Sequence, residues 1–261
     1  MLRLKDKNNS FFSLLEREVM RFVKNPTVTV APPIISQILY VIVFGIILGS
    51  RIGEVGEYSY ISFMFPGLIM MALLTNAYLN PSWSLFSARH HNWIEPIISS
   101  PLGYLQIVSA YIIGGIARGL LVGGTILALG FFLPVYISTS NLVYIIVYMI
   151  LVAFLASTLG CLMGLWAEEY DQIVMILDFL LFPLIFLGGV FYSIEMIEGI
   201  WILELFVELN PITYMIDGLR YGIIGLSELN TTIGLILLIT LSITSFLLTT
   251  YLFIKGYGLR E

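Results

Sequence analysis

The side chains of this chain that could take part in chemistry are concentrated in short polar stretches between long apolar ones. The longest interruption of apolar sequence in the first two-thirds of the chain is 87–101, SARHHNWIEPIISSP. It contributes a guanidinium, two imidazoles, an indole and a carboxylate, from Arg89, His90, His91, Trp93 and Glu95. Adjacent histidines on a helix point about 100° apart, so they make a poor pair of metal ligands. We expect a short helix against the inner face of a membrane, offered to a soluble partner.

A second candidate is Arg118, in the middle of the apolar stretch GGIARGLLVGG. A cation in hydrocarbon costs about 3 kcal/mol on insertion scales, so its side chain is expected to face the bundle interior or water. Asp171 and Asp178 are its expected partners. A structural ion pair and a gating or substrate role both stay open for Arg118. Asp178, in the apolar run VMILDFLLF, is a candidate for a role in transport.

The sequence contains no phosphate-binding GxxxxGK[ST] loop, no HExxH and no GxSxG. Its one cysteine, Cys161, lies in an apolar segment and is expected to be a small buried hydrophobe. The acidic group Glu168, Glu169 and Asp171 has no nucleophile or metal-ligand spacing beside it. We therefore expect no catalytic residue, no metal site and no cofactor on this chain.

The composition predicts a membrane protein. Of 261 residues, 59% are hydrophobic and only 11% charged, whereas a soluble domain has about 25% charged residues. The polar stretches are too short for a nucleotide-binding fold. The expected fold class is an all-α polytopic membrane protein, a single transmembrane domain covering 1–261.

Six stretches are long and apolar enough to cross a bilayer, which takes about 20 residues. The expected spans are 28–48, 60–86, 104–133, 142–166, 173–192 and 231–254. Gly115, Gly119 and Gly123 lie four apart in the third span. A row of this kind lets two helices approach closely, and helix packing is its expected purpose.

Three further helical elements are expected outside the spans. Residues 10–24 have apolar side chains at helical spacing opposite charged ones, which is typical of a helix at the lipid–water interface. Residues 87–100 form the short inner helix. Residues 193–229 alternate acidic and apolar residues and are broken at Asn210–Pro211, so we expect a re-entrant pair of helices on the outer face. A plain extracellular amphipathic loop is the alternative.

The distribution of lysine and arginine predicts the orientation. With the N-terminus inside, nine cations fall on the inner side: Arg3, Lys5, Lys7, Arg17, Arg21, Lys24, Arg89, Lys255 and Arg260. Only Arg51 and Arg220 fall on the outer side. Because cytoplasmic segments carry the excess of Lys and Arg, both termini are expected in the cytoplasm, in a multi-pass protein of the cell membrane.

Three stretches carry a family resemblance: GSRIGEVGEYSYISFMFPGLIMM (49–71), GGIARGLLVG (114–123) and GGVFYSIEMI…LNPITYMIDGLRYG (188–222). With the order of elements, they resemble the ABC-2 type permeases, and among these the YadH-type inner-membrane permeases, relatives of the nodulation-factor and daunorubicin exporters. Asn210, Pro211, Asp217 and Arg220 match a recurrent pattern of the family's outer hairpin. Asp178 departs from the family, where a neutral residue is expected.

The resemblance implies a transporter of two permeases and two separate ATPase subunits that bind ATP and magnesium. We expect the two permeases to be two copies of this chain, a homodimer. Segment 87–100 would be the coupling helix, resting in a groove of the ATPase. The outer hairpin would close the exit path. The implied cargo is amphiphilic, lipid-linked or drug-like and moves out of the cytoplasm. Membrane lipid is the other expected partner, and nucleic acid is not one.

Two other function classes stay open. One is an ATP-independent secondary transporter or channel, which would keep working without an ATPase partner. The other is an integral-membrane enzyme acting on lipid-linked substrates, which would need a cluster of acids, histidines or lysines at one interface. The sequence leaves the cargo itself open.

Overall fold

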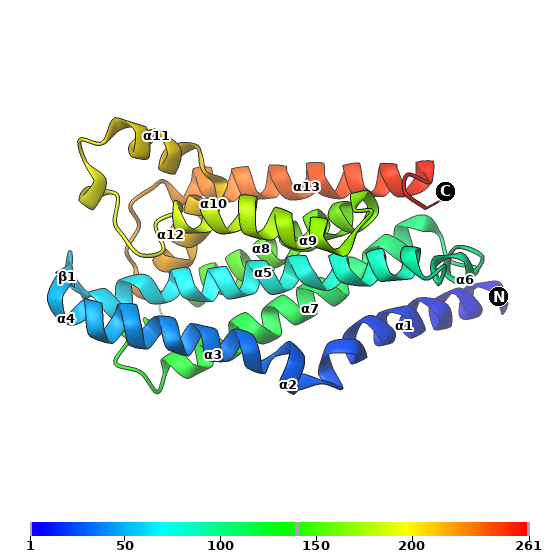
Figure 1. Cartoon of the computed structure of the whole chain (residues 1–261), viewed down its shortest axis with the longest axis horizontal. Coiled ribbons are helices and arrows are strands. Elements are labelled where there is room, and N and C mark those ends of the chain that lie inside the picture. Colours follow the sequence, from blue (N-terminus) through cyan, green and yellow to red (C-terminus); the bar gives the residue numbers. More distant parts are fainter. Residues whose placement is uncertain (1, 139–140, 260–261) are drawn as a thin grey trace.

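The computed structural model of the chain describes residues 2–138 and 141–259, with side chains from Ser10 onward. It is a bundle of long helices that run along one common direction (Figure 1). The first and last helices, α1 and α13, bring both chain ends to the same end of the bundle as α6. We call this the terminal end. The opposite end, which holds β1 and α11, is the hairpin end.

The central element is α5 (Tyr60–His90), which is buried along almost its whole length. Its residues are apolar on every side, without the polar stripe of a surface helix, so it is stable only when other helices cover it all round. Helices α7 (Tyr104–Gly130) and α8 (Leu142–Trp166) provide most of that cover. The predicted span 142–166 has the bounds of α8, whereas 104–133 ends three residues too late.

The glycine row of α7 packs as predicted. A Cβ added at Gly119 would lie 2.7 Å from the Ala77 Cβ, and one at Gly115 would lie 2.9 Å from the Ala77 carbonyl oxygen. A Cβ at Gly123 would lie 3.0 Å from the Cβ of Leu73. The three glycines therefore let the backbone of α7 approach α5 more closely than any side chain would allow.

The first span is longer than the predicted 28–48 and forms one continuous helical stretch, Pro26–Ile52. It is followed by a two-stranded antiparallel hairpin whose turn contains Gly56 at a φ of 62°. The consecutive elements are α2 (Pro26–Thr29), α3 (Ala31–Tyr40), the π-helix η1 (Val41–Leu48), α4 (Gly49–Ile52), β1 (Glu54–Val55) and β2 (Tyr58–Ser59).

The predicted span 173–192 is formed by α9 (Tyr170–Ile176), the π-helix η2 (Leu177–Leu181) and α10 (Phe182–Phe186). They hold 7, 5 and 5 residues, fewer together than the about 20 of a usual span. The helix ends at Phe186, and the chain turns at Gly188–Gly189, where Gly189 has a φ of 79°. Over the described residues, five helices are long and apolar enough to cross a membrane, so a sixth crossing stays a prediction.

The region predicted as an outer helical pair contains a short 3-10 turn and two helices. These are η3 (Glu195–Ile197), α11 (Trp201–Leu209) and α12 (Pro211–Ile224). Helix α12 is buried among α5, α8 and α13 (Thr231–Lys255), whereas α11 exposes most of its apolar side chains. The predicted break at Asn210–Pro211 is present, and α13 extends one residue beyond the predicted 231–254.

Helix α1 (Leu2–Val23) begins well before the predicted 10–24, because residues 2–9 contain no glycine or proline to stop it. Its buried side chains Leu14, Glu18 and Phe22 lie on one face, which packs on α7. In Figure 1 the helix runs at a slant along the bundle instead of across it. Its position at a lipid–water interface stays a prediction.

The helix predicted at 87–100 is much shorter in the structure, and its role in coupling stays a prediction. Residues 87–90 are the last turn of α5, because nothing in that turn breaks the helix. The chain then turns at Asn92, whose φ is 57°, and forms the five-residue α6 (Ile94–Ile98). The polar stretch is thus the corner between a long helix and a very short one.

Replacement of Gly119 by leucine should destabilise the α5–α7 contact, because overpacking costs about 1–3 kcal/mol. The matched control is Gly124→Leu on the same helix, where an added Cβ meets nothing within 4 Å. Thermal unfolding in mild detergent should show a midpoint about 5 °C lower for Gly119→Leu and little change for the control. Equal midpoints would contradict the close packing of these helices.

Candidate functional site

Arg89 ties three chain segments together at the terminal end. Its Nη1 donates to the carbonyl oxygens of Gly164 (2.7 Å) and Ala167 (3.1 Å), at the end of α8. Its Nε donates to the carbonyl oxygen of Gly258, just after α13. The side chain predicted to meet a partner is thus committed to carbonyl groups at helix ends, which otherwise lack donors.

The exposed groups at this end form what we call the terminal corner, residues 90–95. His91 stacks on Trp93, with ring centroids 4.8 Å apart, and His90 stacks on Phe86 at 5.5 Å. Trp93 is 60% exposed, and Glu95 is also exposed. The corner therefore presents an indole, two imidazoles and a carboxylate on a backbone that Arg89 holds in place.

A buried ionic cluster joins α1 to the bundle. Glu18, only 1% exposed, accepts a hydrogen bond from Arg17 Nη2 at 2.9 Å and lies 3.7 Å from Arg21 Nη2. Arg17 also donates to the hydroxyl of Tyr111 (3.2 Å) on α7. Arg21 donates to the backbone oxygen (2.6 Å) and the Oδ1 (2.8 Å) of Asn80 on α5. The cluster fixes α1 to both helices.

The sequence pattern did not single out Glu18, although a signal for it is present. Glu18 lies four residues from Leu14 and from Phe22, in the middle of the apolar face of α1. A Cβ added at Gly114 would lie 2.7 Å from the Glu18 Cβ, so that glycine makes room for the acid. An acidic residue in register with an apolar stripe predicts a buried ion pair.

The expected pairing of Arg118 with Asp171 or Asp178 is wrong. Arg118 Nη2 donates weakly to the carbonyl oxygen of Thr29 at 3.4 Å, and its buried Nε has no partner among the described residues. Asp171 and Asp178 are exposed on α9 and η2. Figure 1 shows α5 between α7 and α9, and this buried helix keeps the opposite charges apart.

At the hairpin end, Arg220 is the centre of a second buried network. Only 2% exposed, it donates from Nη2 to the carbonyl oxygen of Gly189 (2.6 Å) and from Nε to that of Phe63 (3.3 Å). Its Nη1 lies 3.2 Å from Glu228 Oε2, and its guanidinium lies over the Phe63 ring at 3.9 Å. Arg220 therefore connects α12 to the start of α5 and to the segment after α10.

Asp217 organises the loop between α12 and α13. Its carboxylate accepts hydrogen bonds from the hydroxyl of Ser227 (2.7 Å) and from the backbone N–H groups of Glu228 (2.8 Å) and Leu229 (3.2 Å). It lies 4.0 Å from Arg220 Nη1, so two of the predicted hairpin residues are brought together. Glu228, which completes the network, had no distinguishing sequence signal.

Asn210 and Pro211 have a different purpose from Asp217 and Arg220. The Asn210 side chain accepts from the Ile212 N–H (3.0 Å), which caps α12, and donates to the carbonyl oxygen of Leu184 (2.6 Å) on α10. Pro211 occupies the first turn of α12, where a missing N–H costs nothing. The pair starts α12 and anchors it to α10.

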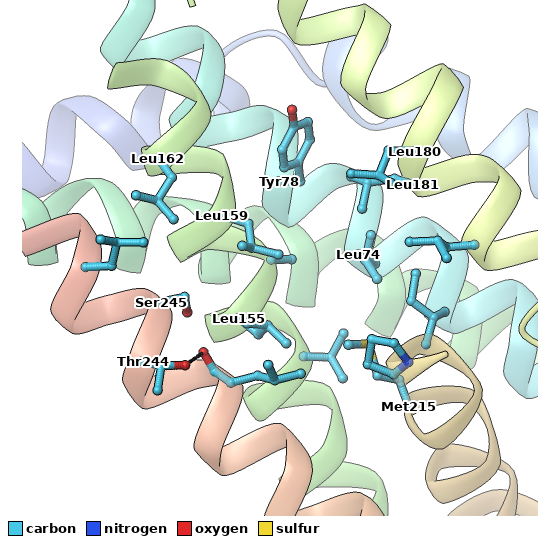
Figure 2. A pocket seen from close by; sticks show the side chains of 17 residues that line it. Leu74, Tyr78, Leu155, Leu159, Leu162, Leu180, Leu181, Met215, Thr244 and Ser245 are labelled. Carbon is cyan, nitrogen blue, oxygen red and sulfur yellow. Dashed lines mark hydrogen bonds between the residues drawn. The ribbon is translucent and has the colours of Figure 1, made fainter. Parts of the chain in front are cut away.

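An apolar cavity of about 400 Å³ lies between α5, α8, α12, α13 and the η2–α10 segment (Figure 2). Leucines from several helices surround it, among them Leu155 and Leu181. The hydroxyl of Thr244 donates to backbone carbonyls of its own helix, and that of Ser245 bonds to Thr158. With its hydroxyls already engaged, the cavity offers hydrocarbon to any occupant.

A second hollow of about 310 Å³ continues this cavity along α8 towards the terminal end. The two share Leu159, Leu162 and Leu180, and the second extends to Trp166. Together they form a continuous hollow between α13 and the η2 segment, which we call the apolar groove.

Comparisons with known proteins agree with this architecture. A model of the ABC-2 type transporter family matches residues 9–224. The chain is 39% identical over 252 residues to the Inner membrane transport permease YadH of Escherichia coli strain K12, covering 95% of this chain and 96% of the relative. It is also 22% identical over 188 residues to Nodulation protein J of Neorhizobium galegae, covering 72% and 71% of the two chains.

Replacement of Arg220 by methionine should destabilise the hairpin end strongly. Removing one partner of a buried ion pair costs about 3–5 kcal/mol, because the remaining carboxylates are left buried without a counterion. The double variant Arg220→Met/Glu228→Gln should recover part of this loss, because one of those charges is gone. Thermal unfolding in detergent measures both effects.

The matched control is Arg51→Gln, an exposed cation at the same end of the bundle. Its unfolding midpoint should stay close to that of the unchanged protein. If Arg220→Met is as stable as this control, the buried network does not hold the hairpin end together.

Proposed function

Because this chain belongs to the ABC-2 type transporter family, we propose that it is the membrane-spanning subunit of an exporter powered by a separate ATPase subunit. The chain is a membrane transport permease with apolar helices long enough to span a bilayer. The observation that carries the proposal is the terminal corner. In this proposal hydrolysis of ATP, with magnesium, takes place on the partner, and this chain is not itself an enzyme.

The terminal corner has the features of a docking surface for a protein. Tryptophan is among the residues that most often dominate binding energy at interfaces, and here Trp93 is exposed but held by its stack on His91. A side chain already fixed in one position loses little conformational freedom when a partner binds. His90 and Glu95 add polar groups around it. In this proposal the ATPase receives the corner in a groove.

Helix α5 supplies a direct mechanical path from that corner to the hairpin end. It is one continuous helix, held at one end by Arg89 and at the other by Arg220, which donates to the Phe63 carbonyl. A displacement of the corner would therefore reach the residues that hold α12. ATP binding on the partner would favour one packing of the bundle, and it can shift the population only by its difference in affinity for the two states.

The hairpin end would close the exit path. Helix α12 is inserted among α5, α8 and α13, and Asp217 and Arg220 lock it to its neighbours. Movement of α5 at Phe63 would loosen this lock. The re-entrant placement of α11 and α12 belongs to the same proposal, and the exposed apolar side chains of α11 support contact with lipid.

The apolar groove supports an amphiphilic or lipid-linked cargo. A hydrocarbon chain placed in it would be stabilised by about 25 cal/mol for each Å² of apolar surface removed from water. The polar part of such a cargo would need another path, along the surface between two permeases. Transport out of the cytoplasm follows the family's exporters.

A second copy of the chain supplies that path. The side chains of Ile35, Leu39 and Ile46 leave an apolar face of the first span uncovered. Asp178 is exposed on η2 beside Phe179, and a carboxylate facing lipid would cost a few kcal/mol. A homodimer that covers these surfaces would remove Asp178 from lipid and place it at the subunit interface. In this proposal Asp178 lines the transport path, and Arg118 stabilises the packing of α1 and the first span.

The terminal end is proposed to face the cytoplasm, in the cell membrane. Arg17 and Arg21 on α1, Lys24 directly after it and Lys255 at the end of α13 lie in this half of the bundle. Lys and Arg accumulate on the cytoplasmic side of membrane proteins. The side chains of Arg3, Lys5 and Lys7, and all of Arg260, lie outside the described residues.

Replacement of Trp93 by alanine should weaken association with the ATPase by about 30-fold or more, because truncating a central interface tryptophan costs about 2 kcal/mol or more. Export and cargo-stimulated ATP hydrolysis should fall with it, whereas membrane insertion and thermal stability should not. The matched control is Trp201→Ala, a 70% exposed tryptophan at the hairpin end. The measurement is a pull-down of the tagged chain in mild detergent with an ATPase assay.

Arg89→Gln separates the corner from its support. Since Arg89 binds backbone carbonyls of α8 and of the C-terminal segment, this variant should lose thermal stability as well as ATPase association. Full association and hydrolysis in Trp93→Ala would refute the docking assignment. Export that continues when the ATPase is absent would support a secondary transporter instead.

A further inference from the structure

A third cavity, of about 470 Å³ and separate from the apolar groove, lies between α1 and the last turns of α5. We call it the basic cavity, because three cations line it: Arg17, Arg21 and Lys24. Among the described residues that line it, Glu18 is the only acid. Cations therefore exceed acids by two at a site that is partly shielded from water.

The cations are not equally engaged. Arg17 neutralises Glu18, and Arg21 is held by both oxygens of Asn80. Both guanidiniums donate these bonds from Nη2, so their remaining N–H groups are available to a ligand. The exposed ammonium of Lys24 pairs with no acid in the described part of the chain. Two uncompensated positive charges and several N–H donors are thus available to bind an anion.

The local electrostatics favour an anion here. Burial lowers the pKa of Arg21, and the charge of Arg17 lowers it further against the opposing effect of Glu18. On α7, Arg118 is close enough to Arg21 for their charges to repel. A bound anion would relieve this repulsion. The hydroxyls of Ser84 and Ser87, which also line the cavity, can donate to its oxygens.

The surroundings of the cavity are those of the membrane surface. Asn25, in its lining, directly precedes the first span, Pro26–Ile52. Met20 in the lining and the neighbouring Val23 and Val28 expose apolar side chains. Trp93 also lines the cavity, and tryptophan is enriched in the lipid headgroup region of membrane proteins. An acidic protein segment would match the cations but would leave these apolar side chains uncovered.

We propose that the basic cavity binds the phosphate of an anionic phospholipid of the inner leaflet, with the acyl chains along the exposed apolar surface of the first span. Arg21 and Lys24 would hold the phosphate through charge-assisted hydrogen bonds, and Arg17 would supply a further donor. Basic pockets between helices on the cytoplasmic side of membrane proteins recognise such headgroups. The lipid would then connect α1 to the terminal corner. The site depends on this chain alone and on no step of the transport cycle.

The test uses the full-length chain in nanodiscs, either of phosphatidylcholine alone or with about a third of it replaced by phosphatidylglycerol. The anionic lipid should raise the thermal unfolding midpoint by about 3 °C or more. Lys24→Gln should remove at least half of that rise. The matched control is Lys255→Gln, an exposed cation at the same end of the bundle, which should keep the rise.

A second readout follows the lipid itself. Native mass spectrometry of the chain extracted from the mixed nanodiscs should find fewer retained phosphatidylglycerol molecules on Lys24→Gln than on Lys255→Gln. Equal retention and equal midpoint shifts in both variants would overturn the proposal, because they indicate only general attraction to a charged membrane.

Two further arms decide the source of the phosphate. Inorganic phosphate is added to nanodiscs of phosphatidylcholine alone, and protection that Lys24→Gln abolishes would assign the site to a free anion and overturn the lipid assignment. An absent lipid effect, together with loss of ATPase association in Lys24→Gln, would assign the cavity to the protein partner and likewise overturn it. Neither result changes the proposed function, which depends on Trp93.

Discussion

The bundle depends on a constraint at its centre: α5 is buried on every side, so each of its polar groups must find a partner inside the protein. Thr75, Asn76 and Ser82 bond to the preceding turn of the helix itself, and the hydroxyls of Tyr60 and Tyr78 donate to carbonyls of other segments. An arginine holds each end of the helix. Arg220 of α12 donates to the Phe63 carbonyl near the start of α5, and Arg89 in the last turn of α5 donates to the Gly164 carbonyl of α8. A displacement at one end of such a helix would reach the other end, because α5 is one continuous helix bonded to its neighbours at both ends.

One of the two prolines inside α5, Pro81, shows how the neighbouring helices meet this constraint. Pro81 has no N–H to offer the Ala77 carbonyl four residues earlier. The hydroxyl of Ser157 on α8 donates to that oxygen instead, at 3.3 Å. A Cβ added at Gly115 on α7 would lie 2.5 Å from the same hydroxyl, so only glycine leaves room for it. One missing hydrogen bond thus explains a serine on one helix and a glycine on another, and the three helices form a single unit.

The parts of the fold that sequence periodicity could predict are those decided locally. The bounds of α8, the glycine row of α7 and the break at Asn210–Pro211 follow from apolar length, residue size and proline chemistry. The partners of charged residues depend instead on which helices become neighbours. Arg118 was expected to pair with an acid on α9, but α5 lies between them. The burial of Glu18 results from the packing of α1 on α7, and this choice of neighbour is not decided within α1 itself.

The same distinction explains why a count of cations bears on orientation and not on function. For orientation every lysine and arginine near the membrane counts equally, since the rule concerns only on which side they lie. In the folded chain they are not equal. Arg89 is engaged by backbone carbonyls at helix ends and Arg17 by a buried acid, whereas the exposed ammonium of Lys24 pairs with no acid in the described part of the chain. The groups available for recognition are therefore those that make no hydrogen bond or ion pair within the folded chain. Among the described residues at the terminal end they include the indole of Trp93 and the ammonium of Lys24. The first suits a protein surface and the second a phosphate, so one end of the bundle can contact a partner and a lipid through different side chains.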